Sequence, residues 1–198
     1  MKQHSRVFVV SGASRGLGRA ITEAALEAGH RVVAGARKVS ALDDLAARYA
    51  DPLAVVALDV ADDGQVRAAV AAAVDRFGGV DVLVNNAGYA NMAAIEDVDF
   101  DDFRTQVDTN FFGVVRLTRE VLPIMREQRH GNIIQISSVG GRIVRPGLSA
   151  YQSSKWAVTG FSDSHPNGLG WIIRHRTVHR CVSNEAFHIM GTIEYKRG

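Results

Sequence analysis

The segment Tyr151-Gln152-Ser153-Ser154-Lys155 places a tyrosine and a lysine four residues apart. On a helix, this spacing brings both side chains onto one face. A tyrosine is a poor acid–base catalyst at neutral pH unless a nearby cation favours its phenolate, and Lys155 can supply that cation. The pair therefore predicts proton transfer to or from an oxygen atom, as carbonyl reduction requires. By itself the spacing is common, and such a pair is more often an exposed surface pair.

Further polar residues follow apolar runs that are typical of buried strands. The nearest to the pair is Ser138, which lies thirteen residues before Tyr151 at the end of the run Asn132–Ser137. Ligands of parallel α/β sheets bind outside the carboxyl ends of the strands. Residues that follow successive strands are therefore predicted to lie along one edge of the sheet. The candidates of this kind are Asn86, Ala87 and Gly88 after Val82–Val84, Asp59 and Val60 at the end of Leu53–Leu58, and Asn110 in the next helical region.

A glycine-rich loop separates the first apolar run from an alanine-rich helical segment. Glycine lets the backbone turn sharply and approach a ligand closely, and a helix N-terminus offers free N–H groups and a positive dipole end to a pyrophosphate. A glycine cluster can also be a plain turn, but the position between strand and helix favours a dinucleotide site. The candidate loop residues are Gly12, Ser14, Arg15, Gly16, Leu17 and Gly18.

The residues after the second apolar run bear on the choice between the two nicotinamide cofactors. An acidic residue there would bind the ribose hydroxyls and favour NAD, and none is present. Arg37 and Lys38, together with Arg15, instead place positive charge where a 2′-phosphate would lie. Solvated surface charges are the alternative interpretation. The pattern favours NADP, with NAD as the other possibility.

Short β-branched runs alternate with longer segments of helical period. This order predicts an α/β fold with a doubly wound, Rossmann-type parallel sheet between two layers of helices. The predicted strands are Val7–Val10, Arg31–Ala34, Leu53–Leu58, Val82–Val84 and Asn132–Ser137. The predicted helices are Arg15–Ala28, Ser40–Tyr49, Asp62–Phe77 and Phe100–Gln128, followed by one that begins at Tyr151.

Taken together, these motifs resemble those of the single-domain branch of the short-chain dehydrogenase/reductase family. Gly-x-x-x-Gly-x-Gly, Asn-Asn-Ala-Gly, the serine thirteen residues before the tyrosine, and Tyr-x-x-x-Lys occur in the order of the family, over about residues 5–162. The resemblance implies reversible hydride transfer between a nicotinamide cofactor and a small-molecule carbonyl or alcohol. It also implies a homodimer or homotetramer that pairs the helix at about 100–128 and the one starting at Tyr151.

The resemblance also implies a role for each matching residue. Tyr151 would donate or accept the proton, while Lys155 would favour its phenolate and bind the nicotinamide ribose. Ser138 would orient the substrate oxygen, and Asn110 would hold a water that links Lys155 to solvent; the alternative for Asn110 is a helix surface residue. Gly12, Arg15, Gly16 and Gly18 would line the phosphates, Asp59 would contact the adenine, and Asn86 to Gly88 would support the adenosine side.

Composition excludes several other classes of protein. The chain has 198 residues, enough for one domain, and a formal charge of +2 without a basic run, which argues against a nucleic-acid partner. No apolar stretch is long enough to span a membrane, and the apolar run after the N-terminus is too short for a signal peptide. Cys181 is the single cysteine, so no internal disulfide is possible. We expect a soluble, cytoplasmic protein.

The chain changes character after Ser162. Alanine becomes rare, four of the seven histidines follow, and Pro166 and Gly168 interrupt the helix, while only Trp171–Ile173 suggests a short strand. We therefore divide the chain into a dinucleotide-binding domain, residues 1–162, and an atypical tail, residues 163–198. In the tail we expect the sixth strand, the Pro-Gly turn and the substrate lid of the family to be incomplete. A frameshifted translation, a natural truncated form and a divergent lid all explain this change.

Two interpretations of function follow from this division. The first is an NADP-preferring reductase; the second is an inactive cofactor-binding fragment or regulatory pseudo-enzyme. A metal site is not predicted, because His175 and His179 could share a helix face but have no third ligand and are surrounded by arginines. Cys181 is interpreted as an inert thiol, since no catalytic partners accompany it.

Overall fold

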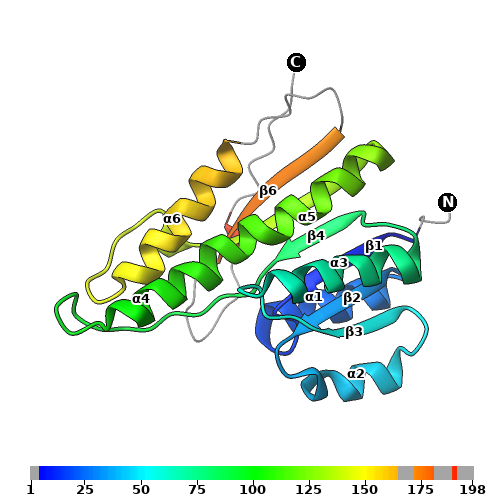
Figure 1. The fold of residues 1–198 in the computed structure, drawn as a ribbon, viewed down its shortest axis with the longest axis horizontal. Coiled ribbons are helices and arrows are strands. Elements are labelled where there is room, and N and C mark those ends of the chain that lie inside the picture. The colour runs from blue at the N-terminus through cyan, green and yellow to red at the C-terminus, as the bar shows by residue number, and fades with distance from the viewer. Residues whose placement is uncertain (1–4, 165–171, 181–188, 191–198) are drawn as a thin grey trace.

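A central, mostly parallel sheet organises the computed structural model, which describes residues 5–164, 172–180 and 189–190. Within these residues the strand order is β3-β2-β1-β4-β5-β6-β7, and only β7 runs antiparallel to its neighbour (Figure 1). The strands are β1 Val7–Ser11, β2 Arg31–Ala36, β3 Leu53–Ala57, β4 Val82–Asn85, β5 His130–Ser138, β6 Ile172–Arg180 and β7 Ile189–Met190.

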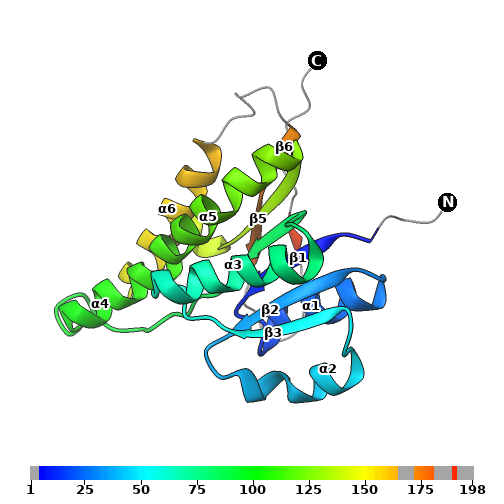
Figure 2. The same ribbon diagram turned by 45° about the vertical axis from the view of Figure 1, so that its right-hand side comes forward.

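Helices pack on both faces of the sheet, as Figure 2 shows. The helices α1 and α2 contact β1, β2 and β3 on one face, whereas α3, α5 and α6 cover β1 to β6 on the other. Their bounds are α1 Gly16–Glu27, α2 Asp43–Arg48, α3 Asp63–Phe77, α4 Phe100–Val107, α5 Gly113–Gln128 and α6 Ser149–Asp163. The predicted Rossmann-type architecture, with helices above and below a parallel sheet, is therefore confirmed.

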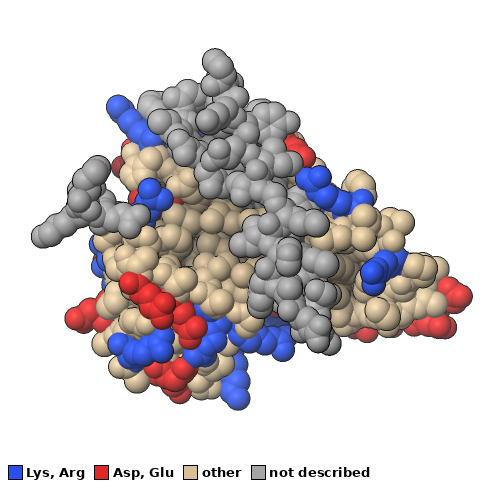
Figure 3. Space-filling view, turned by 180° about the vertical axis from the view of Figure 1, so that it is seen from behind, with Lys and Arg blue, Asp and Glu red and all other residues tan. Residues whose placement is uncertain are grey.

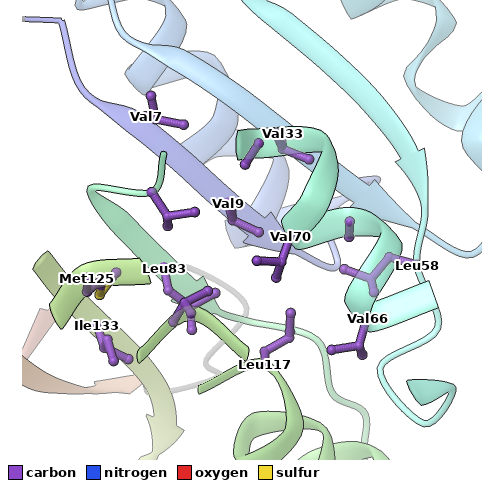
Figure 4. Close-up of a cluster of buried hydrophobic side chains, with 14 of the residues drawn as sticks. Val7, Val9, Val33, Leu58, Val66, Val70, Leu83, Leu117, Met125 and Ile133 are labelled. Atoms are coloured by element: carbon purple, nitrogen blue, oxygen red, sulfur yellow. The ribbon is translucent and has the colours of Figure 1, made fainter. Parts of the chain in front are cut away.

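Alternate residues of each buried strand enter two separate cores. Val9 and Val33 face α3 and α5, where they pack with Val70 and Leu117 (Figure 4). Val10 faces α1 and α2 instead. Strands that bury both faces must be apolar throughout, which explains the continuous apolar runs in the sequence. This packing holds the carboxyl ends of the strands along one edge of the sheet.

Chain order reverses between β1 and β4, which are neighbours in the sheet. From β1 the chain proceeds outward to β2 and β3, then returns to β4 and continues outward through β5 to β6. A crevice forms at such a switch point because the two connections leave in opposite directions, and ligands of α/β proteins bind there. The glycine loop follows β1 and Asn86 follows β4, so both predicted cofactor segments border this point.

The predicted helix Phe100–Gln128 is interrupted in its middle. A π-helical turn, Asp108–Phe112, separates α4 from α5 and contains Asn110. One extra residue per turn rotates the side chains relative to a regular helix, and such turns are frequent at functional sites. The turn leads directly into Gly113, where an added Cβ would lie 2.5 Å from Cγ2 of Val60. The helix thus approaches the end of β3 closely at this glycine.

The sixth strand is longer than the short strand that Trp171–Ile173 suggested. β6 extends from Ile172 to Arg180 and pairs with β5 along its whole length. Strand pairing with a neighbour overrides the weak local pattern of this segment. His175 and His179 consequently lie in a strand, where residues four apart are separated by about 13 Å, not on one helix face. The domain boundary at residue 162 stays a prediction, as do the three explanations of the tail.

Two surface features of the described residues bear on possible partners. None of their helices is long and apolar enough to cross a membrane. Basic and acidic side chains are interspersed around α2, at the lower left of Figure 3.

Candidate active site

The glycine loop turns tightly between β1 and α1. Gly12 and Gly16 both have positive φ angles, +66° and +56°, which L side chains rarely adopt. A Cβ on Gly18 would lie 2.3 Å from the carbonyl oxygen of Gly12, so the start of α1 packs directly on the loop. By contrast, nothing lies within 4 Å of the position of a Cβ on Gly16, which faces open space. These features produce a bare backbone surface at the end of β1.

The N-terminus of α1 has free hydrogen-bond donors. Its cap residue, Arg15, makes no side-chain hydrogen bond to the first turn, and that turn contains no acidic residue. The helices α3 and α4, in contrast, are each capped by an aspartate, Asp62 and Asp99, that accepts two backbone N–H groups. An uncapped helix start beside a glycine loop fits a pyrophosphate, because the N–H groups and the helix dipole favour an anion there.

Side chains connect the ends of β1 and β4 across the switch point. The Asn86 amide Nδ2 donates to the carbonyl oxygens of Ser11, at 3.0 Å, and Gly12, at 3.1 Å. In return, the Ser11 hydroxyl oxygen accepts the backbone N–H groups of Asn86 and Ala87, at 3.0 and 3.1 Å. Ser11 was not among the predicted site residues, although its place as the last residue of β1 was a usable signal. These bonds hold the two predicted cofactor segments against each other.

The ends of β2 and β3 carry the residues predicted to meet the adenosine half of a cofactor. Arg15, Arg37 and Lys38 are exposed, and among the described residues none of them has an ion-pair partner. Asp59 is half-buried, and its Oδ1 accepts the backbone N–H of Ala61 at 3.0 Å. Free positive charge therefore stands beside β2.

Two other predicted cofactor residues, Val60 and Leu17, have their side chains packed on the protein. Val60 is 4% exposed and packs on Gly113, so only its backbone could contact a ligand. Leu17 is half-buried against the core on the α1 face of the sheet, and Ser14 beside it is also half-buried. Ser14 therefore keeps a partly accessible side chain at the loop.

Ser138 and Tyr151 lie on either side of one backbone position. Ser138 is the last residue of β5, and its hydroxyl oxygen accepts the N–H of Gly140 at 3.1 Å. A Cβ added to Gly140 would lie 3.5 Å from Oγ of Ser138 and 3.3 Å from Cε1 of Tyr151. The serine hydroxyl and the tyrosine ring therefore approach the same point, from β5 and α6 respectively. The glycine there leaves room for both.

Lys155 lies one turn after Tyr151 on α6, with only 5% of its surface exposed. Its Nζ donates to the carbonyl oxygen of Ile136 at 2.8 Å and lies 5.8 Å from the centroid of the Tyr151 ring. A buried ammonium group is costly unless it is hydrogen-bonded, so this bond stabilises the lysine in its position. The alternative interpretation, an exposed Tyr–Lys surface pair, does not describe this lysine.

Asn110 is fully buried and connects three segments of the site. Its Oδ1 accepts the backbone N–H of Tyr89 at 3.0 Å, and its Nδ2 donates to the Tyr89 carbonyl oxygen at 2.8 Å and to Oγ of Ser154 at 3.2 Å. Ser154 in turn donates to the carbonyl oxygen of Tyr151 at 2.7 Å. The interpretation of Asn110 as a helix surface residue is therefore wrong. A Cβ on Gly88 would lie 2.9 Å from Oδ1 of Asn110 and 3.5 Å from Nζ of Lys155, so both side chains border Gly88.

Several residues that support the site were not predicted from the sequence. Gln106 is 1% exposed and donates to the Tyr89 carbonyl oxygen at 2.8 Å, and Ser154 on α6 accepts the hydrogen bond that joins Asn110 to this helix. Ser154 lies inside the Tyr-x-x-x-Lys motif, but the motif alone does not indicate its partner. Burial and the charge of Asp102 raise the pKa of the Tyr89 phenol, so this phenol stays protonated at neutral pH.

The bare glycine loop and the pair of Tyr151 and Lys155 lie at one edge of the sheet. The four predicted catalytic residues Ser138, Tyr151, Lys155 and Asn110 come together, each within a short chain of contacts from the next. A buried lysine beside a tyrosine can stabilise a phenolate, and a neighbouring serine can bind an oxygen. Among the described residues, no group of three or more His, Cys, Asp or Glu side chains is arranged to hold a metal ion.

Comparison with known proteins identifies the family of this chain. A family model for short chain dehydrogenases matches residues 6–170. The oxidoreductase BOA17 of Botryotinia fuckeliana is 54% identical over 159 residues, which are 80% of this chain and 58% of that protein. This chain therefore spans little more than half the length of that relative.

Solved structures of the same family share the fold. The short-chain dehydrogenase of Streptomyces avermitilis superimposes with a TM-score of 0.85 at 40% identity, covering 89% of this chain and 65% of that one. A short-chain dehydrogenase/reductase of Burkholderia phymatum, in complex with NAD, gives a TM-score of 0.84 at 27% identity, covering 89% of this chain and 66% of that one. Together with the match over residues 6–170, these likenesses show that the chain belongs to the short-chain dehydrogenase/reductase family.

Proposed function

We propose that this chain is an oxidoreductase that interconverts a carbonyl and an alcohol by hydride transfer, with NADP as its preferred cofactor. The observation that carries the proposal is the buried Lys155, held by Ile136 near the ring of Tyr151, while Ser138 and that ring both approach Gly140. This set supplies a proton donor, a cation that favours its phenolate, and a hydroxyl that can bind the reacting oxygen. A tyrosine and a lysine that only stabilised the fold would not require a serine hydroxyl beside the tyrosine ring.

In the reductive direction, the chain's residues act on the substrate oxygen. Ser138 donates a hydrogen bond to that oxygen and orients it beside the Tyr151 hydroxyl. As the carbonyl carbon accepts the hydride, the C=O π bond breaks and the oxygen takes the proton of Tyr151. Lys155 stabilises the phenolate that remains. Asn110 holds the backbone of Tyr89 and, through Ser154, the start of α6, and so keeps these groups in register.

The residues of the glycine loop fit a nicotinamide dinucleotide. Gly12, Gly16 and Gly18 leave the backbone bare, and the uncapped start of α1 offers its N–H groups to a pyrophosphate. Asn86 steadies the loop from β4. When bound, the reduced nicotinamide supplies the hydride from its C4 atom. The Burkholderia phymatum relative was solved with NAD, which supports a nicotinamide cofactor without deciding between the two forms.

The NADP preference rests on the charge beside β2. Arg37 and Lys38 are exposed, lack ion-pair partners among the described residues, and directly follow the strand that would meet the adenosine ribose. No carboxylate stands at this strand end to bind the ribose hydroxyls. A guanidinium group binds phosphate oxygens with two parallel hydrogen bonds, which favours Arg37 as the reader of a 2′-phosphate.

Replacing Tyr151 with phenylalanine tests the assignment of the proton donor. The variant Y151F keeps the ring and its packing but loses the hydroxyl, so we expect kcat/KM for a carbonyl probe to fall about 100- to 10,000-fold. NADPH affinity should be nearly unchanged, because the hydroxyl acts on the substrate in the transition state. Turnover within a few-fold of the parent chain would contradict the assignment.

A thermal melt with each cofactor separates binding from turnover. A ligand that binds only the folded state at about 100 times its Kd adds about 2.7 kcal/mol of stability. For a chain of this size that gain raises Tm by roughly 5–10 °C. We expect a larger rise with NADPH than with NADH at equal concentration. Equal rises would remove the basis for an NADP preference.

A second candidate function is a cofactor-binding protein without turnover. The observation that favours it is the change in composition after Ser162, where alanine becomes rare and four of the seven histidines follow. The two functions differ in one result: this second candidate requires a cofactor-dependent rise in Tm without oxidation of NADPH by any carbonyl probe. Consumption of NADPH that Y151F abolishes excludes it.

We also propose that the chain forms a homodimer or homotetramer through the surface of α4, α5 and α6. Phe100, Phe112 and Trp156 expose 64%, 48% and 50% of their surface, and Phe100, Phe103 and Phe112 border a hollow of about 480 Å³. Exposed aromatic side chains at this density are typical of association surfaces.

The single Cys181 is compatible with a reducing, cytoplasmic setting.

A further inference from the structure

Two loops beside the candidate catalytic residues are joined to each other. These rim loops, residues 89–99 and 142–148, lie at the same end of the molecule as α4 and the start of α6 (Figure 1). The N–H of Ala93 in the first donates to the carbonyl oxygen of Gly147 in the second, at 3.0 Å. A Cβ on Gly147 would lie 3.3 Å from Cγ of Met92, so the loops are also in close contact through that side chain.

Each rim loop is fastened to the catalytic groups. Tyr89, at the start of the first loop, is held through both its backbone N–H and its carbonyl by Asn110. In the second loop, the Ile143 carbonyl accepts a hydrogen bond of 3.2 Å from Nε2 of Gln152, the residue after Tyr151. The rim loops are therefore hydrogen-bonded to Asn110 and to Gln152, the residue after Tyr151, and lie beside the residues that would bind and protonate the carbonyl. A substrate longer than its reacting group must extend past them.

Large apolar side chains are concentrated on these loops. The structure has nine exposed large hydrophobic residues among those it describes, and four lie here: Met92, 76% exposed, Ile95, 63%, Ile143, 49%, and Val144, 79%. Single exposed hydrophobic residues are ordinary, but a cluster beside a reactive site indicates a binding surface for an apolar group. The loops also carry exposed charged side chains, Glu96 and Asp97 on the first and Arg145 on the second, while Asp99 caps α4.

We propose that these four residues bind the non-reacting part of the substrate, and that the substrate is a lipophilic ketone or aldehyde rather than a sugar or another polyhydroxylated carbonyl compound. The inference rests on the proposed reductase function. The carbonyl carbon accepts the hydride and the oxygen accepts the Tyr151 proton, while the alkyl part lies on Met92 and Val144. Each methylene transferred from water to this surface should improve binding about fourfold.

Methyl ketones of increasing chain length, from butanone to decanone, test the proposal. With NADPH and the full chain, we expect kcat/KM to rise about threefold to fourfold with each added methylene until the apolar surface is covered. The double variant M92S/V144S should flatten this dependence, with a larger loss for decanone than for butanone. Both residues are highly exposed, so serine at these positions should not impair folding. Val74→Ser, on α3 and 38% exposed, is the matched control and should keep the dependence of the parent chain.

Binding to the Y151F variant with NADPH separates the two levels of the argument. A ketone Kd that falls with chain length supports the apolar surface even if the parent chain shows no turnover, which would refute only the reductase function. Turnover that is independent of the chain length of the ketone, or a dependence that M92S/V144S keeps, would overturn the substrate inference and leave the reductase function standing.

A second copy of the chain could cover the same side chains instead. A lower molecular mass of M92S/V144S in sedimentation, without a change in ketone Kd, would establish that occupant and overturn the inference.

Discussion

Replacing Asn110 with alanine should destabilise the protein far more than its position in a helical segment suggests. Asn110 is fully buried and makes three hydrogen bonds, two to the backbone of Tyr89 and one to Ser154. In N110A the Tyr89 carbonyl still has the Gln106 amide as donor, and Ser154 still donates to the Tyr151 carbonyl. The Tyr89 N–H, however, loses the acceptor that Asn110 provided. The variant thus leaves one backbone donor without that partner, together with a small cavity.

The magnitude follows from these losses. An unsatisfied buried donor costs about 1–3 kcal/mol, and each further hydrogen bond lost contributes about 1 kcal/mol. The cavity left by three side-chain heavy atoms adds somewhat less than 1 kcal/mol, at about 24 cal/mol per Å³. We therefore expect the free energy of unfolding of N110A to fall by about 4–6 kcal/mol. Activity should also fall, because Tyr89 and α6 lose their common anchor.

Gln106→Ala is the matched control for this prediction. Gln106 is equally buried and larger, but the Tyr89 carbonyl it serves keeps Asn110 as a second donor. Urea unfolding followed by circular dichroism should show a larger loss for N110A than for Q106A, at similar m values. If N110A loses less than about 1 kcal/mol, or less than Q106A, then the orphaned Tyr89 N–H does not carry the cost assumed here.

Three other predictions test the glycine loop, the charge beside β2, and the ion pair of His130 and Asp81 where β4 and β5 begin. Gly18→Ala would place a methyl group 2.3 Å from the carbonyl oxygen of Gly12 in the same loop. The variant should lose about 1–3 kcal/mol of stability in urea unfolding and bind NADPH more weakly. The control is Gly160→Ala, where nothing lies within 4 Å of the added Cβ, and it should be neutral or stabilising. Arg37→Ala should raise the NADPH Kd at least about tenfold and the NADH Kd little; equal losses by calorimetry would make Arg37 a surface charge. A hydrogen bond to Asp81 raises the pKa of His130, so its stabilising effect is present at low pH and is lost as the pH rises through the folded-state pKa. Unfolding between pH 5 and 8 should show this loss, at most about 0.5 kcal/mol because the side chain is 58% exposed, in the parent chain but not in His130→Gln.

The sequence determined the architecture of residues 5–164 and the candidate site residues along one sheet edge. Strands buried on both faces must be apolar, so β1 to β5 stood out as continuous apolar runs, and each was predicted within two residues of its observed bounds. The glycines of the phosphate loop were equally readable, because positive φ angles and a 2.3 Å approach leave no other residue type at Gly12 and Gly18. Such features depend on local backbone conformation and on burial, which residue type reports directly.

Only the tertiary structure decided how the site residues support one another. The Asn110 amide bonds reach Tyr89, 21 residues away, and Ser154, 44 residues away, and Asn86 reaches Ser11 over 75 residues. The π-helical turn that contains Asn110 and the extension of β6 along β5 likewise depend on neighbours distant in sequence. Local periodicity carries no information about a partner many residues away, since that partner is set by how the sheet and helices pack. For this reason the sequence indicated Asn110 as a candidate, and the fold alone showed it as the buried connection between the first rim loop and α6.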